Sequence, residues 1–139
     1  MLLTQNLLLF GCGTVDPGTS GLASSTCLPD PRMFALQLYP VLSESCGTAN
    51  CHGQPGPLII PAATSGFPTD VEVSSPEDLV EPFRSSYYSV IQHCDLKHPD
   101  KSLVVTWATG QQSSHPGGAA LSSEDLELLL QWIRSGGAK

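Results

Sequence analysis

The sequence predicts a mainly α domain with long loops and two short strands. Three segments combine helical spacing of apolar residues with start signals, which lie at Asp30-Pro31, Ser75-Pro76 and Ser122. Between them, 13 glycines and 12 prolines in 139 residues predict many turns and irregular connections. No apolar run approaches the ~20 residues of a membrane-spanning helix. The length suits one domain with a modest core.

The first helix is expected from Pro31 to just before Cys46. Asp30 is a good N-cap, and the apolar face is Phe34, Leu38, Val41 and Leu42. Pro40 lacks an amide hydrogen and crowds the carbonyl of Leu36, so we expect a kink or restart there.

The middle of the chain is predicted to be mostly loop. Short strands are expected at residues 58–60 and 71–73. A capping-box start at Ser75 leads into helical spacing up to Ile91, which Pro82 divides into a short turn and a longer helix. A short helix is expected after Pro99, ending near Gly110. The last helix starts at Ser122 and ends at Gly136.

The segment Cys46-Gly47-Thr48-Ala49-Asn50-Cys51-His52-Gly53 places two cysteines directly before a histidine. Covalent haem attachment uses Cys, two residues, Cys, His, and here four residues separate the cysteines. Each thiol can add to one haem vinyl group, which leaves His52 as the proximal iron ligand through a neutral imidazole nitrogen. The alternative is a local Cys46–Cys51 disulfide with an incidental histidine.

Charge and cysteine content restrict the function further. The net charge of −7, with only 6 Lys and Arg, argues against a nucleic-acid or anionic-membrane surface. Five cysteines in so short a chain indicate an oxidising compartment. We expect one lipidated cysteine, two haem thioethers and a Cys27–Cys94 disulfide. The alternatives are a buried free thiol at Cys94, or two disulfides that leave Cys12 over.

The N-terminal segment ending Leu9-Phe10-Gly11-Cys12 resembles a bacterial lipoprotein signal, which implies acylation of Cys12. It departs from that pattern because it is short and lacks a basic residue before Cys12. We expect residues 1–11 to be a signal remnant, 12–29 a flexible tether and 30–139 the folded domain. The expected location is the periplasm or the outer membrane, with membrane contact only through the lipid. The alternative is a short apolar tail packed on the domain.

Three stretches resemble the small c-type cytochrome domains of planctomycete and myxobacterial secreted proteins and lipoproteins. They are Phe34 to Leu42 with the cysteine motif, His98 to Val105, and the closing Trp132-Ile133 with its small-residue tail. The resemblance covers residues 31–139 and implies a cytochrome c-like helical fold around one haem. In such domains the first and last helices cross, so Phe34 and Leu38 are expected to meet Leu129 and Ile133. The cysteine spacing and His98, which stands where an acid is usual, are departures.

A second iron ligand has four candidates in the sequence: Met33, His93, His98 and His115. In the resembling family a Met-Pro segment follows the short helix and precedes the last one, and His115-Pro116 stands at that place. The resemblance therefore implies His115 as the distal ligand, with His98 as the next candidate, and a bis-histidine haem c.

The expected function is single-electron transfer, without enzymatic activity, to and from redox partners that carry a basic docking patch. Three alternatives stay open. The first is a haem-based sensor of a small ligand, or an accessory binding module of a larger assembly. The second is an enzyme such as a peroxidase, which needs an open iron position. The third is a haem-free lipoprotein domain stapled by disulfides.

Overall fold

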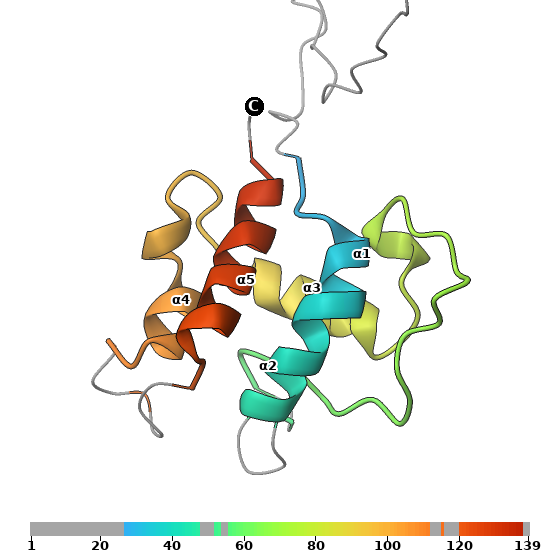
Figure 1. Ribbon diagram of the computed structural model, residues 1–139, viewed down its shortest axis with the longest axis horizontal. Coiled ribbons are helices and arrows are strands. Elements are labelled where there is room, and N and C mark those ends of the chain that lie inside the picture. The colour runs from blue at the N-terminus through green and yellow to red at the C-terminus, as the bar shows by residue number, and fades with distance from the viewer. Residues whose placement is uncertain (1–26, 48–51, 54–55, 112–114, 116–119, 138–139) are drawn as a thin grey trace, which may run out of the picture.

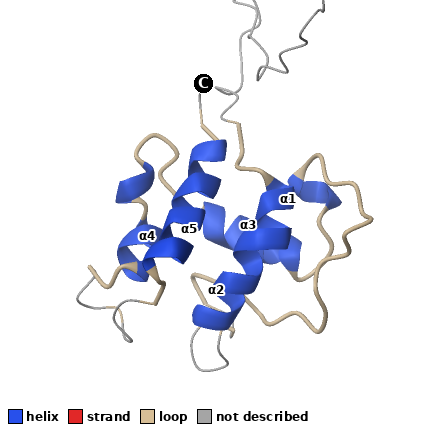
Figure 2. Cartoon of the chain, viewed as in Figure 1, coloured by secondary structure: helices blue, strands red, loops and turns tan. Residues whose placement is uncertain are grey.

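The computed structural model describes residues 27–47, 52–53, 56–111, 115 and 120–137. Within these ranges the regular elements are all helical, as Figure 2 shows, so the mainly α class is confirmed. The strands expected at 58–60 and 71–73 are not formed. The amide of Ile59 donates instead to Ser89 Oγ at 2.6 Å, and the amide of Ile60 donates to the carbonyl of His52 at 2.7 Å. Because these two amides already donate to a side chain and to a loop carbonyl, they take no part in a strand ladder.

The first helix forms in three consecutive parts, which are α1 (Pro31–Met33), the π-helical η1 (Phe34–Leu38) and α2 (Tyr39–Ser45). The Asp30 carboxylate caps its start by accepting from the amide of Met33 at 3.0 Å. The disturbance expected at Pro40 takes the form of a widened turn, because the amide of Tyr39 donates to Phe34 five residues back. The wider turn makes room for the proline ring without ending the helix.

The remaining helices follow the expected signals. The 3-10 turn η2 (Pro76–Asp78) carries the predicted capping box, and Pro82 separates it from α3 (Phe83–Ile91). A second 3-10 turn, η3 (Pro99–Lys101), leads into α4 (Leu103–Ala108). The last helix, α5 (Ser123–Ser135), is capped by Ser122, whose Oγ accepts from the amide of Asp125 at 3.1 Å.

The core forms where η1 packs against α5 and α3, as Figure 1 shows. The Phe34 ring centroid lies 5.2 Å from that of Trp132 and 5.3 Å from that of Tyr87. The first helix therefore packs on the last, and the measured contact joins Phe34 to Trp132, which the prediction did not name. The predicted contacts of Phe34 and Leu38 with Leu129 and Ile133 stay a prediction. The other three residues named for this contact are fully buried in the same core: Leu38, Leu129 and Ile133.

The segment just before α1 belongs to the fold. Pro29 is fully buried, and its carbonyl accepts from the Tyr87 hydroxyl at 2.6 Å. The amide of Gly137 donates to the carbonyl of Cys27 at 2.7 Å. The packed domain therefore includes Cys27 to Pro29, which the sequence assigned to the tether. The expected signal remnant and the lipidated Cys12 lie outside the described residues. None of the described helices is both long and apolar enough to cross a membrane.

Candidate functional site

The chain after α2 folds back tightly over the end of that helix. The amide of Gly47 donates to the carbonyl of Leu42 at 3.0 Å, and the amide of His52 donates to Cys46 at 3.1 Å. A Cβ at Gly47 would lie 2.7 Å from the carbonyl oxygen of Ser43, and closer still to that of Ile60. Only glycine therefore allows this return, which brings His52 to the C-terminal end of α2.

A backbone carbonyl fixes the orientation of the His52 ring. Nδ1 of His52 lies 3.1 Å from the carbonyl oxygen of Leu58. Because a carbonyl only accepts, Nδ1 carries the hydrogen and donates it. In the neutral imidazole, Nε2 then carries the lone pair that a metal-ligating histidine uses.

His115 lies on a loop that leaves and rejoins the fold at the end of α4. Gly110, with φ of 70°, ends the helix, and the amide of Gln111 donates to the carbonyl of Thr106 at 3.0 Å. The amide of Ala120 donates to the carbonyl of Ala108, also at 3.0 Å. Gln111 and Ala120, on either side of His115 in the chain, are therefore both tied to α4 by backbone hydrogen bonds.

The two histidine rings lie close together although they are 63 positions apart in the chain. The centroids of His52 and His115 are 5.9 Å apart, and the ring planes differ by 5°. Two imidazoles on opposite sides of one metal ion, with metal–nitrogen bonds of about 2 Å, have centroids roughly 6 Å apart. Nδ1 of His115 is also buried without a hydrogen-bond partner among the described residues. A bare buried ring nitrogen is unfavourable unless a ligand satisfies it.

The other candidate ligands lie elsewhere. His98 is exposed, and its Nδ1 lies 3.3 Å from Asp95 Oδ2. Hydrogen bonds to the Asp95 carboxylate, first from the amide of His98, hold the pKa of Asp95 below its usual range. Nδ1 of His93 lies 2.8 Å from the carbonyl oxygen of Ser89. Met33 is partly buried against the core. The fold thus brings His115, and not His98, to His52.

Two of the predicted cysteine roles concern attachment of a cofactor. Cys46 forms the C-cap of α2 and is half-buried against the core, on the same return of the chain that carries His52. Cys51 lies outside the described residues. Of the two expected attachment points, only Cys46 therefore lies among the described residues.

The predicted Cys27–Cys94 disulfide is wrong. Cys94 is a free thiol, whose Sγ donates to the carbonyl of Val90 at 3.3 Å. Cys27 is disulfide-bonded, but not to Cys94. The Cys94 side chain turns back onto the last turn of α3, and burial raises the pKa of its thiol to about 12. Spacing alone could not reveal this, because a pairing depends on side-chain direction.

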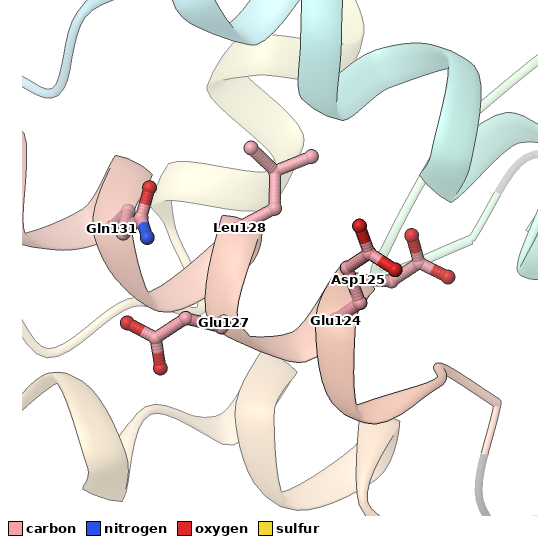
Figure 3. Close-up of a pocket in the computed structure, with 5 residues that line it drawn as sticks. All are labelled: Glu124, Asp125, Glu127, Leu128 and Gln131. Atoms are coloured by element: carbon pink, nitrogen blue, oxygen red, sulfur yellow. The ribbon is translucent and has the colours of Figure 1, made fainter.

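A surface hollow on α5 is lined mainly by acidic and polar residues, shown in Figure 3: Glu124, Asp125, Glu127, Leu128 and Gln131. Its acids have local roles, because Asp125 Oδ2 accepts from the Ser122 hydroxyl at 2.7 Å and Glu127 pairs with Arg134 at 3.0 Å. Acids in the first turn also stabilise the helix start. Among the described residues, no group of three or more His, Cys, Asp and Glu side chains is placed to hold a metal ion.

Comparisons with protein-family models, with curated proteins and with solved structures find no match to this chain. The candidate site consists of two nearly parallel imidazoles and a half-buried cysteine. One imidazole is oriented by a carbonyl, and the other has a buried ring nitrogen without a hydrogen-bond partner among the described residues.

Proposed function

We propose that this chain is a c-type cytochrome that carries single electrons on one covalently attached haem. Cys46 and Cys51 would form the thioether links, and His52 and His115 would bind the iron. The observation that carries the proposal is the His52–His115 pair, with ring centroids 5.9 Å apart.

The donor set suits a haem iron better than a protein-only metal site. Imidazole is a ligand for iron, copper, nickel and zinc, and zinc sites usually need three or four protein ligands. Here two nearly parallel imidazoles lie close together, and no larger ligand cluster is found among the described residues. A haem, whose iron is already bound by the porphyrin, would need only two further ligands from the protein, and His52 and His115 would supply them.

The protein's own groups would hold the iron and tune it. The hydrogen bond from His52 to the carbonyl of Leu58 fixes the ring and raises its basicity as a ligand. When bound, haem supplies an iron that changes between the ferrous and ferric states by one electron. With both histidines bound to the iron, no position would remain for a substrate, which favours electron transfer over catalysis. Two histidine ligands also give a lower reduction potential than methionine–histidine ligation.

The charge of the chain bears on its partners. With a net charge of −7, it would be attracted to a redox partner that presents a basic docking patch, with salt-sensitive affinity. The disulfide bond of Cys27 is typical of an oxidising compartment. We place the protein outside the cytoplasm, in the periplasm or at the outer membrane.

The proposal is tested by producing the full chain in a bacterial host that has haem-attachment machinery. A pyridine haemochrome spectrum and an intact mass should report one covalently bound haem. His52→Ala should lose the six-coordinate spectrum, whereas His98→Ala, the matched control, should keep it. The reduced wild-type protein should bind carbon monoxide poorly. A colourless wild-type protein would contradict the proposal.

A further inference from the structure

Trp107 lies between the candidate ligand His115 and the end of α3. Its ring centroid is 6.1 Å from that of His115, and the two planes differ by 15°. The His93 ring also contacts Trp107, at 5.1 Å between centroids. Nδ1 of His93 is held in turn by the carbonyl of Ser89, 2.8 Å away. The indole thus connects the His115 loop to a residue anchored on α3.

The position of Trp107 on α4 is well fixed. The buried face of this helix consists of Val104, Val105 and Ala108. Trp107 is half-buried at the border of that face. The amide of Val104 donates to the carbonyl of His93 at 3.2 Å, which joins the start of α4 to the end of α3. The indole is therefore presented by a short helix that is tied to the core.

The two histidines of the pair are oriented by different means. The His52 ring is held by its hydrogen bond to Leu58, whereas Nδ1 of His115 has no partner among the described residues. The ring contacts of His115 within the described part of the chain are with Trp107 and His52. Among the described residues, stacking on Trp107 is therefore the contact that can set the plane of the His115 ring.

We infer that Trp107 is the positioning residue for the distal ligand. The inference rests on the proposed function. The indole holds the plane of the His115 imidazole nearly parallel to that of His52, and it keeps this ring in place beside the iron. Outer-shell groups that orient metal-ligating histidines typically change metal affinity or activity by about 10- to 100-fold when removed. Removal of the Trp107 ring should therefore loosen His115 without detaching a covalently linked haem.

The test compares haem-loaded full-length variants. Trp107→Leu removes the aromatic face, Trp107→Phe keeps one, and Leu103→Ala changes an exposed residue on the same helix as a control. Haemochrome spectra and circular dichroism establish haem content and fold. In Trp107→Leu, the rhombic ferric EPR signal typical of parallel imidazole planes should broaden and become more anisotropic. Carbon monoxide should bind the ferrous form of this variant at least about 10-fold more tightly than it binds ferrous wild type. Trp107→Phe and Leu103→Ala should stay close to wild type.

The outcomes separate the two proposals. A Trp107→Leu protein that contains haem but keeps the wild-type EPR signal and carbon monoxide affinity overturns the inference and leaves the proposed function intact. A wild-type chain without covalent haem overturns both. Should Trp107→Leu not fold, the ferrous wild-type protein decides by NMR. Nuclear Overhauser effects between the Trp107 indole and the His115 ring are expected, and their absence overturns the inference.

Discussion

Gly47 and Gly66 both lie in connections between helices, but their surroundings in the fold are opposite. A Cβ on Gly47 would meet the backbone oxygens of Ser43 and Ile60, whereas a Cβ on Gly66 meets nothing within 4 Å. The lack of a side chain at Gly47 therefore allows the chain that leads to His52 to lie close to the end of α2. At Gly66 the lack of a side chain adds only freedom in the unfolded chain.

The two glycines give a matched pair of substitutions. Gly47→Ala should destabilise the domain by about 1–3 kcal/mol, because the backbone around it has to move. Gly66→Ala should be neutral or stabilise by up to ~1 kcal/mol. Urea unfolding followed by circular dichroism measures both. Equal effects at the two positions would show that the tight return is not formed in solution.

The distal ligand can be tested by exchange for methionine. His115→Met should raise the midpoint potential of the bound haem, because methionine–histidine ligation gives higher potentials than two histidines. His98→Met is the control, since His98 is exposed and pairs with Asp95. Redox titration followed by visible absorption measures the midpoint. An unchanged midpoint and spectrum in His115→Met would remove His115 from the iron.

The candidate site could be predicted in part at this scale. The cysteine motif indicated His52, and the position of His115 before the last helix indicated the second ligand, so the proximity of the two rings agrees with that assignment. The Cys27–Cys94 disulfide was predicted wrongly, because sequence spacing does not show which way a thiol points. Cys94 Sγ donates a hydrogen bond to the carbonyl of Val90 instead. Trp107 was not recognised as a contact of His115, because its role depends on how α4 packs beside α3.

At the scale of elements, local signals predicted most boundaries. The caps at Asp30 and Ser122 and the stop at Gly110 depend on neighbouring residues only, and all three are formed. The π-helical form of η1 was not predicted, because the choice between a kink and a widened turn depends on tertiary packing. The strands at 58–60 and 71–73 failed for the same kind of reason, since a strand needs a neighbouring strand that no local pattern guarantees.

The capping box of η2 supports a pH-dependent prediction. The amides of Ser74 and Ser75 donate to Asp78 Oδ2 at 3.0 and 2.8 Å, and they hold the pKa of Asp78 below its usual range. A lowered folded-state pKa stabilises the fold above the unfolded value of about 3.9, and this stability is lost as the pH falls through the folded-state pKa. Wild type should therefore be more stable than Asp78→Asn at pH 7, and the gap should close toward low pH.

Thermal unfolding of wild type and Asp78→Asn between pH 2 and pH 7 measures this gap. Asp100→Asn is the control, because Asp100 is an exposed acid in the first turn of η3 that accepts no hydrogen bond among the described residues. Its variant should follow the wild-type stability curve closely. A gap for Asp78→Asn that stays constant with pH would mean that the charge of the carboxylate does not matter.

At the scale of the whole molecule, the net charge of −7 sets how the protein meets other charged molecules. The base of the His115 loop leads directly into the acidic first turn of α5, which contains Glu124 and Asp125. The loop of residues 61–75, drawn in green in Figure 1, lies on the other side of the first helix from α5. Electron exchange near His115 should therefore depend more on charges at the start of α5 than on charges in that loop.

Small charged redox complexes measure this dependence without an identified partner. The rate of electron exchange with cationic hexaammineruthenium should fall as salt is added, and the rate with anionic hexacyanoferrate should rise, because screening weakens attraction and repulsion alike. Glu124→Lys should lower the cation's rate by about threefold or more at low salt, because a nearby charge changes the local potential most. Glu72→Lys makes the same charge change in the 61–75 loop and should have a smaller effect. Equal effects from the two variants would mean that the site of electron exchange lies no closer to the start of α5 than to the 61–75 loop.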